Sequence, residues 1–334
     1  MKPILFVIDK FSFETLLLLI GSSILAAGII FFFFRKRAKS VKVLKNIIIE
    51  YLLFVIVLLI LLYKFGPFPV RTYGVAIATA FLAAIFIARY LAKKSGVNPD
   101  YILDLGMYVL IGVIIGARLF YIIFYDWSYY MAHPLKMFAI WEGGLVFYGG
   151  FFGGIAAGYY FLKKKKLAVL KIADMVGVAL PLGLFFGRWG CFGYGCCYGK
   201  IAPKNFPFAI RFPAKNPMTG YTPAFEEHLH EGLLTLSDKF SLPVYPTQLI
   251  SSLNGLLIFT FLFFMYKRKK FEGQIAALSV MLYSVGRFLI EFLRVEPKFL
   301  NLSISQWIAI FTFGFGIWLY KYAKKLNAYG TVGK

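Results

Sequence analysis

The sequence predicts an all-α membrane protein with several spans, on two observations. Of its 334 residues 60% are hydrophobic and 19% are aromatic, and the mean hydropathy is +0.73, which is far too apolar for an ordinary soluble domain. The apolar runs last about 20 residues and lack the alternation of apolar and polar positions that a membrane barrel shows. Because only helices and closed barrels satisfy backbone polar groups in lipid, we expect a helical bundle.

Nine runs are long and apolar enough to be transmembrane helices. They cover residues 13–34, 46–64, 72–92, 101–125, 144–162, 172–190, 247–266, 272–293 and 303–320. The first two hold almost no ionisable residue, so we interpret residues 1–67 as a two-span extension of a seven-span body formed by 68–190 and 247–334. We expect residues 191–246 to form a small extracytoplasmic head, because the segment is too long for a simple loop and contains seven of the 14 prolines.

The formal net charge of +22 is concentrated between the apolar runs. Basic clusters lie at 35–45, 163–166, 267–270 and 321–325. Such clusters mark cytoplasmic loops and attract anionic lipid, so we expect the N-terminus outside and the C-terminus in the cytoplasm. This distribution disfavours nucleic acid as a partner. The N-terminal run contains Glu14 and precedes Arg-Lys-Arg, which predicts an uncleaved span rather than a signal peptide.

Charged residues inside the apolar runs are candidate functional groups, because a charge at membrane depth costs about 3 kcal/mol or more. Arg188 lies among glycines in GRWGCFGYGCCYG, where it either binds a ligand or reaches the interface with its head group. Arg287, Glu291 and Arg294 in GRFLIEFLR share one helix face. Their net positive charge suits a phosphate, and the alternative is a self-neutralised structural cluster.

Other polar residues leave two interpretations open. The glycine pairs of WEGGLVFYGGFFGG at 141–154 either let helices pack closely or bind an anion at a helix N-terminus. Arg118 and Asp174 are expected to pair with each other or with another buried charge. Tyr73, next to Arg71 at the start of a span, is either an interfacial anchor or part of a site.

The three cysteines and the two histidines of the head can each be interpreted as functional or as purely structural residues. Cys191, Cys196 and Cys197 lack the paired spacing of a metal site and have no histidine nearby, so we expect no metal there. They either pack as small apolar residues, with one disulfide possible, or they are redox-sensitive or covalently reactive. His228 and His230 in AFEEHLHEG suit either a metal site or a solvated surface.

Several motifs, taken together and in order, resemble the bacterial prolipoprotein diacylglyceryl transferases. They are RTYG at 71–74, GGLVFYGG at 143–150, GRWGCFGYGCCYG at 187–199, YPTQL at 245–249, GRFLIEFLR at 286–294 and LSISQW at 302–307. The similarity covers about residues 68–323. It implies a reaction at the bacterial cytoplasmic membrane in which phosphatidylglycerol gives its diacylglyceryl group to the lipobox cysteine of a prolipoprotein. A thioether forms and glycerol phosphate leaves, without a cofactor.

The resemblance also implies roles for particular residues. Arg188 and Arg287 would hold the donor phosphate and stabilise the leaving group. For the acceptor thiol three means of activation stay open: Tyr148, Glu291, or the field of the arginines alone, since a thiol with a pKa near about 8.5 needs only a small lowering. The expected partners are phosphatidylglycerol, the signal peptide of the prolipoprotein and membrane lipids. Further substrate contacts are expected from Tyr73, Gly143, Gly144, Gly149, Gly150, Cys191, Gly199, Gln248, Tyr283 and Arg294.

The sequence departs from the family pattern at several of these positions. Tyr148 and Tyr245 stand where the family has histidines, Cys191 replaces an asparagine, and Cys196 replaces an acidic residue. A tyrosine, with a pKa near about 10, is a poor base unless cations lower its pKa. Two alternatives to the transferase follow: a related enzyme that uses the same phospholipid with another acceptor, and a lipid-binding membrane protein without catalysis.

Overall fold

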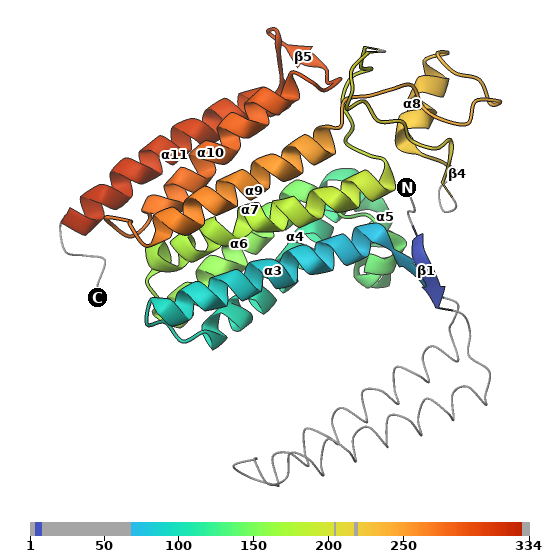
Figure 1. Cartoon of the computed structure of the whole chain (residues 1–334). Helices are drawn as coiled ribbons and strands as arrows, with labels where there is room; N and C mark the ends of the chain where they lie inside the picture. The colour runs from blue at the N-terminus through green and yellow to red at the C-terminus, as the bar shows by residue number, and fades with distance from the viewer. Residues whose placement is uncertain (1–3, 9–67, 204, 217–219, 329–334) are drawn as a thin grey trace, which may run out of the picture.

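The computed structural model describes residues 4–8, 68–203, 205–216 and 220–328, and its main body is a bundle of long helices (Figure 1). The predicted spans 13–34 and 46–64 lie outside these residues. Each of the seven other predicted spans coincides with a long helix. These helices are α3 (Thr72–Lys94), α4 (Asp100–Tyr125), α6 (Phe147–Lys164), α7 (Val169–Tyr194), α9 (Thr247–Tyr266), α10 (Gln274–Glu291) and α11 (Ile304–Ala328).

Five helices of the described residues are long and apolar enough to cross a membrane: α3, α4, α7, α9 and α10. This confirms a helical membrane protein. Helices α6 and α11 are less apolar, because α6 contains glycines, tyrosines and two terminal lysines and α11 ends in a lysine-rich turn. The full number of nine spans therefore stays a prediction.

The helices alternate in direction and give the bundle two different ends. Lys93, Lys94, the run 163–166 and the segments 267–270 and 321–325 all lie at one end, which we call the basic end. The described residues of 195–246, which we call the head segment, lie at the other, the head end (Figure 1). The basic clusters of the sequence thus lie together at one end of the folded bundle.

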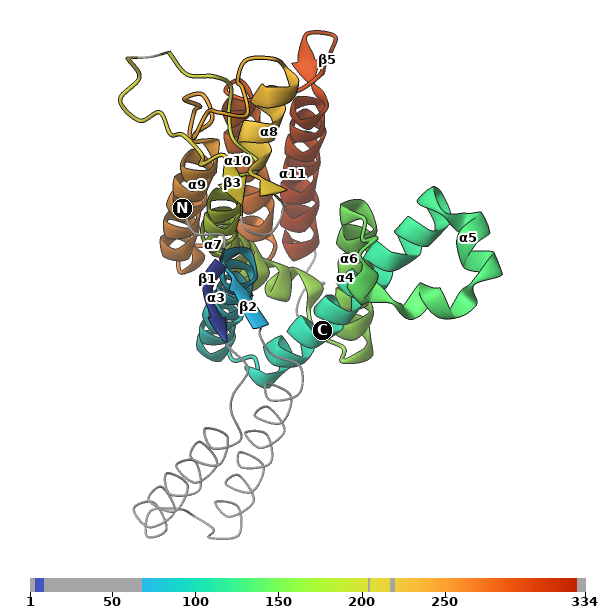
Figure 2. The ribbon, with the colours of Figure 1, turned by 90° about the vertical axis from the view of Figure 1, so that its right-hand side faces the viewer.

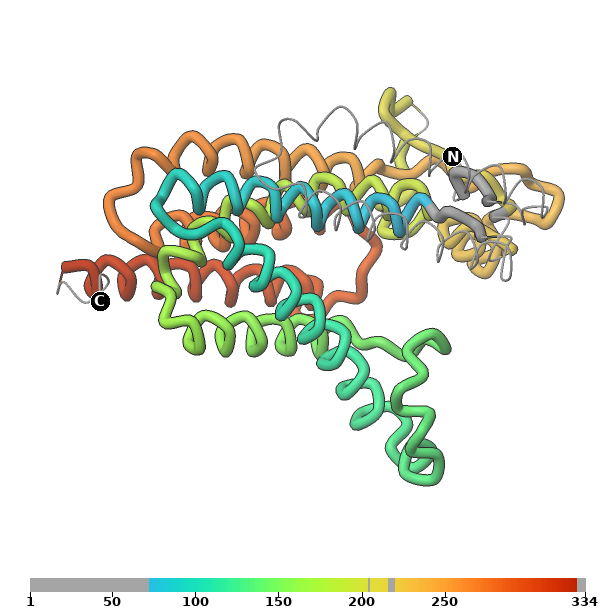
Figure 3. Tube along the Cα trace, turned by 90° about the horizontal axis from the view of Figure 1, so that it is seen from below, coloured from blue at the N-terminus to red at the C-terminus, as the bar shows by residue number. Residues whose placement is uncertain are grey.

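The largest buried cluster lies toward the basic end and joins all but the last of these helices. Leu91 of α3, Phe161 of α6, Met175 of α7, Leu262 of α9 and Ile275 of α10 belong to it. Toward the head end, α4 and α6 diverge from the others and stand to one side (Figures 2 and 3). The packing therefore closes one half of the bundle, and the charged residues of the candidate site lie in the other half.

Helices α4 and α6 approach each other through glycines. A Cβ at Gly149 would lie 2.3 Å from the carbonyl oxygen of Gly116, and one at Gly153 would lie 2.2 Å from that of Gly112. Such contacts are impossible for any larger residue, so backbone packs directly on backbone. The packing interpretation of the glycine pairs therefore fits Gly149, and it also fits Gly150, whose Cβ would lie 3.2 Å from Val113.

Helix α7 continues past its predicted end at residue 190 to Tyr194. It ends at Gly195, whose φ of +85° is the left-handed conformation that commonly terminates helices. The sequence prediction stopped too early because Arg188 and Gly190 look like an interface. As a consequence, Cys191 lies in the helix, one turn after Arg188.

Smaller elements occupy the head end. Between α4 and α6 the chain forms α5 (Trp127–Ala132) and two 3₁₀ turns, η1 (Pro134–Phe138) and η2 (Ile140–Glu142). The head segment contains β3 (Lys215–Asn216), β4 (Gly220–Tyr221) and α8 (Pro223–His230) around buried Phe212, Ala224 and Val244. Two antiparallel pairs complete the fold: β1 (Ile4–Ile8) with β2 (Phe68–Arg71), and β5 (Lys298–Phe299) with β6 (Leu302–Ser303).

Candidate functional site

A pocket in the head-end half of the bundle brings two of the predicted arginines together. Helices α7, α9 and α10 form its walls. It is lined by Leu184, Arg188, Ser251, Asn254, Gly255, Tyr283, Arg287 and Ile290. Two guanidinium groups and no carboxylate line this pocket, so it is suited to an anion.

Arg188 is half-buried, and unlike Arg287 it has no carboxylate partner among the described residues. No carboxylate of the described chain lies within 4.0 Å of its guanidinium group. Gly190, two residues on, presses against α3, since a Cβ there would lie 3.1 Å from Ala76 and from the Tyr73 ring. The missing side chain of Gly190 therefore makes room for a neighbouring helix rather than for a ligand.

Arg287 is held by two groups. Its Nη1 lies 2.5 Å from Oε2 of Glu291, one helical turn away, and its Nη2 donates to Ser305 Oγ at 2.8 Å. Glu291 is only 3% exposed and accepts a further bond from Ser303 Oγ at 3.0 Å. The carboxylate therefore fixes the direction of the guanidinium group, which is a geometry for positioning Arg287.

Two glycines allow the close packing that places the uncharged polar side chain of Asn254 at the pocket. A Cβ at Gly286 would lie 2.3 Å from Nδ2 of Asn254, so the absence of a side chain lets this amide lie directly on α10. A Cβ at Gly255 would lie 2.8 Å from the carbonyl of Pro181, so α9 can cross α7 closely. Asn254 was missed in the sequence, although an amide in the apolar run LNGLLIF is itself an unusual residue.

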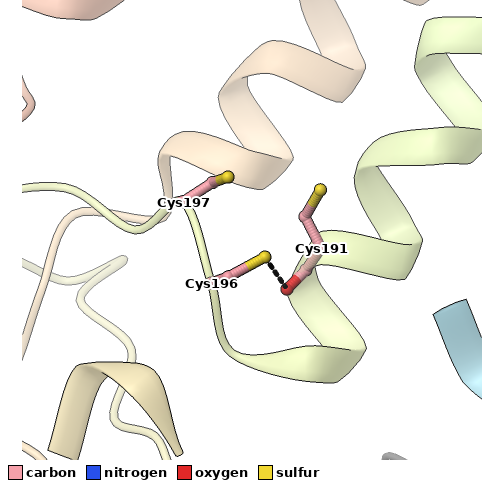
Figure 4. Close-up of side chains that lie close together, drawn as sticks. All are labelled: Cys191, Cys196 and Cys197. Atoms are coloured by element: carbon pink, nitrogen blue, oxygen red, sulfur yellow. Dashed lines mark hydrogen bonds between the residues drawn. The ribbon is translucent and has the colours of Figure 1, made fainter. Parts of the chain in front are cut away.

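The loop after α7 forms a second polar centre next to Arg188. The Sγ atoms of Cys191, Cys196 and Cys197 lie within 4.8 Å of one another. Figure 4 shows the three side chains turned toward a common space, with Cys196 Sγ donating to the Cys191 carbonyl at 3.8 Å. This contact could not be predicted from the sequence, because the spacing of the three cysteines is unlike that of known metal motifs.

Helix α9 holds this loop in place. Fully buried Gln248 donates from Nε2 to the carbonyl of Cys196 at 2.8 Å, and Thr247 Oγ1 donates to that of Cys197 at 2.7 Å. A Cβ at Gly199 would lie 2.6 Å from the carbonyl of Leu293. Gln248 and Gly199, both expected to contact substrate, are thus placed where they shape the loop beside Arg188.

Electrostatics differ among the thiols of this loop. The pKa of Cys197 is lowered by hydrogen bonds from the thiols of Cys191 and Cys196, and further by the charges of Arg188 and Arg294, against the effect of burial. The pKa of Cys196 is raised by its hydrogen bonds with the thiols of Cys191 and Cys197, and further by burial. Cys197 also has a φ of +60°, which is unfavourable for a residue with a Cβ, so the fold forces its side chain into the group.

The residues before α6 form a separate arrangement built on Arg118. This side chain is 5% exposed and donates to four backbone carbonyls: Lys136 at 2.7 Å, Met137 at 3.0 Å, Gly143 at 2.7 Å and Gly144 at 3.3 Å. Gly143 and Gly144, with φ of +90° and +71°, make the turn. Tyr148, the proposed base, lies in the first turn of α6, is 53% exposed and does not line the pocket.

Arg118 and Asp174 do not pair with each other. Fully buried Asp174 accepts from Gly273 N and Ala276 N at 2.9 Å each, and lies 2.9 Å from Lys269 Nζ. It lies near the basic end, whereas Arg118 lies toward the head end. The sequence analysis expected each to pair with the other or with another buried charge. The second alternative is confirmed for Asp174, which pairs with Lys269, and is wrong for Arg118, whose described partners are backbone carbonyls.

The other predicted residues are dispersed around these centres. Tyr73 of α3 is 47% exposed and lies against α7 beside the cysteines. Arg294 is paired with Glu296 at 2.9 Å. In the head segment, His228 is 4% exposed and accepts from Leu242 N at 3.3 Å, whereas His230 is exposed. Among the described residues, neither histidine belongs to a cluster of three or more potential metal ligands.

Comparisons with known proteins cover most of the chain. The prolipoprotein diacylglyceryl transferase family matches residues 59–322. The chain belongs to this family. A relative named phosphatidylglycerol–prolipoprotein diacylglyceryl transferase from Paraburkholderia xenovorans is 34% identical over 282 residues, covering 78% of this chain and 92% of the relative.

Relatives of the same name from other bacteria give similar figures. The one from Bordetella avium is 33% identical, with 77% of this chain and 91% of the relative covered. The one from Burkholderia multivorans is 32% identical, with 79% and 94% covered. The family resemblance inferred from the motifs is therefore confirmed over nearly the range that the motifs indicated.

Proposed function

We propose that this diacylglyceryl transferase moves the diacylglyceryl group of phosphatidylglycerol to the cysteine of a prolipoprotein signal peptide. The observation that carries the proposal is the pocket of Arg188 and Arg287, within a chain that aligns to nearly the full length of relatives with this activity. The acceptor sulfur attacks the glycerol carbon, the carbon–oxygen bond to phosphate breaks, and glycerol phosphate leaves with the electron pair.

The two arginines have different tasks in this reaction. Arg188 is unpaired by any described carboxylate, so it supplies a full positive charge to the phosphodiester. Arg287 is partly neutralised by Glu291 but is rigidly aimed, and its remaining N–H groups donate to a second phosphate oxygen. Together they stabilise the charge that develops on the leaving group, because neither guanidinium can act as a base.

Neither Glu291 nor Tyr148 is placed to act as the general base in this proposal. Glu291 is buried against Arg287 and Ser303, so its role is to position Arg287. Tyr148 is exposed at the start of α6 and suits contact with the incoming peptide. Tyr283 and Asn254 line the pocket and are proposed contacts of the donor head group.

The orientation follows from the two ends of the bundle. The basic end faces the cytoplasm by the positive-inside rule, which puts the head segment and the pocket at the outer leaflet of the bacterial inner membrane. Nine spans, with the N-terminus outside and the C-terminus inside, remain the proposed topology. Labelling of single cysteines introduced into a cysteine-free variant, at position 230 and at position 324, distinguishes the two faces.

The decisive experiment uses purified protein, phosphatidylglycerol and a lipobox peptide, with thioether formation followed by mass spectrometry. The wild type should form the adduct, and Arg188→Ala should lower the rate by about 10²–10³-fold, as for loss of one donor to a developing charge. The matched control is Arg89→Ala, which removes a half-buried arginine at the basic end, far from the pocket. Release of glycerol phosphate without peptide adduct would point to a different acceptor, and equal rates for both variants would refute the role of Arg188.

A further inference from the structure

The three clustered thiols raise a question that the phospholipid pocket does not answer. The acceptor cysteine must lose its proton, yet Tyr148 is exposed and outside the pocket, and Glu291 is engaged with Arg287 and Ser303. The cluster lies one turn beyond Arg188 on α7 and in the loop that follows. A group at this place can act on a sulfur that attacks a phospholipid bound by Arg188.

The geometry of the cluster fits a metal ion. With metal–sulfur bonds of about 2.3 Å, three thiolates around one ion lie roughly 4 Å apart, and the observed sulfur atoms are all within 4.8 Å of one another. The expectation of no metal depended on the spacing of the cysteines and on the lack of a nearby histidine. The fold removes the first argument by gathering the three thiols, and three thiolates need no histidine to hold an ion. Three thiolates are soft ligands that favour Zn²⁺ among the divalent ions commonly bound by proteins.

The surroundings support such a site by rigidity and by charge. The carbonyls of Cys196 and Cys197 are tied to Gln248 and Thr247, and the φ of +60° at Cys197 shows a backbone held against its own preference. Arg188 and Arg294 are close enough to act electrostatically on the cluster. They offset the net negative charge of three thiolates and one divalent cation.

We propose that Cys191, Cys196 and Cys197 bind one Zn²⁺ ion through three thiolates, and that the acceptor cysteine of the prolipoprotein takes the fourth position. Zinc with three protein ligands and one open position is the arrangement of catalytic sites. A thiol that coordinates zinc is deprotonated, so the ion replaces the missing base. The second half of this proposal rests on the proposed function.

The step balances without a redox change. The acceptor thiol displaces water from the ion and gives its proton to solvent. Its sulfur then attacks the glycerol carbon, the carbon–sulfur bond forms, and the carbon–oxygen bond breaks with its electron pair passing to the phosphate. The thioether is a weak ligand, so the product leaves the metal.

Gln248 adds an independent sign that this place is incomplete. Its side chain is fully buried, and its Oε1 has no hydrogen-bond partner among the described residues, while its Nε2 is bound to the loop. A buried acceptor without a partner is costly. A water on the metal, or an amide of the bound peptide, would supply the donor.

Metal content and cobalt spectra of the detergent-solubilised full chain test the site itself. Reduced protein should bind about one Zn²⁺ or Co²⁺ per chain, with the intense absorption of thiolate-bound cobalt. Cys197→Ser should lose the absorption, and His230→Ala, a change at the exposed histidine, should keep it. A lipobox peptide should alter the cobalt spectrum, whereas the same peptide with serine for cysteine should not.

Activity against pH tests the role of the ion. A free thiol with a pKa near about 8.5 is only a few per cent ionised at pH 7, so zinc removal should slow thioether formation roughly 10–30-fold there and much less at pH 9. Other groups near the cluster that influence the profile are Tyr73 on α3, Arg188 on α7 and Arg294 after α10. Return of zinc should restore the rate.

The outcomes separate this inference from the transferase function. Zinc-free protein that forms the thioether at an unchanged rate at pH 7 would overturn the metal's role and leave the transferase intact. Absence of bound metal in reduced protein, or a disulfide among the three cysteines in protein alkylated at extraction, would overturn the site. No thioether with or without zinc would refute the transferase function, while the cobalt spectrum would still decide the metal site.

Discussion

Replacing Asp174 by asparagine should destabilise the bundle by about 3 kcal/mol. The carboxylate is fully buried and holds two backbone N–H groups of α10 and its preceding turn, at Gly273 and Ala276, together with Lys269. Asparagine keeps one oxygen and puts an amide N–H₂ against a backbone donor, which leaves a buried donor unsatisfied at about 1–3 kcal/mol. Lys269 loses one counter-charge but keeps Glu272, so this part adds about 1 kcal/mol.

The matched control for this change is Asp100→Asn. That carboxylate also pairs with a cation, Arg89, but its side chain is 71% exposed, so its loss should amount to less than about 1 kcal/mol. Thermal unfolding of the detergent-solubilised protein, followed by the soluble fraction after heating, should give a Tm lowered by roughly 5–10 °C for Asp174→Asn. Equal shifts for the two variants would refute the reasoning, because burial would then have no influence.

Three further predictions concern packing, the Arg118 turn and the head segment. Gly116→Ala forces a methyl group onto the α6 backbone and should destabilise by about 1–3 kcal/mol, whereas Gly314→Ala, with open space around it, should be neutral or stabilising in the same thermal assay. Arg118→Lys cannot serve four carbonyls, so limited proteolysis between residues 126 and 146 should accelerate severalfold, and Arg89→Lys should leave it unchanged. Burial lowers the pKa of His228 against nearby carboxylates, so the unfolded chain gains a proton first as pH falls below about 6.5. Stability should drop from that pH down to the lowered pKa, and His228→Asn should flatten this drop; an identical pH dependence in the variant would exclude His228 as its source.

The sequence determined the helical membrane class, the basic end and the family. Each depends on properties that persist in any packing: long apolar runs must become helices in lipid, lysines gather at one end of the bundle, and the motif order is a linear property. Arg188 and Arg287 could also be named, because a guanidinium group in an apolar run is rarely without purpose.

Tertiary structure decided which residues meet. Arg118 serves four carbonyls and Asp174 serves the start of α10, a choice that no periodicity contains. Gly149 and Gly190 admit neighbouring helices, and the turn at Gly195 gathers three thiols of irregular spacing within 4.8 Å. These contacts are set by helix crossings and by a loop conformation, which depend on residues far apart in the chain, so their chemistry becomes visible only after the chain has folded.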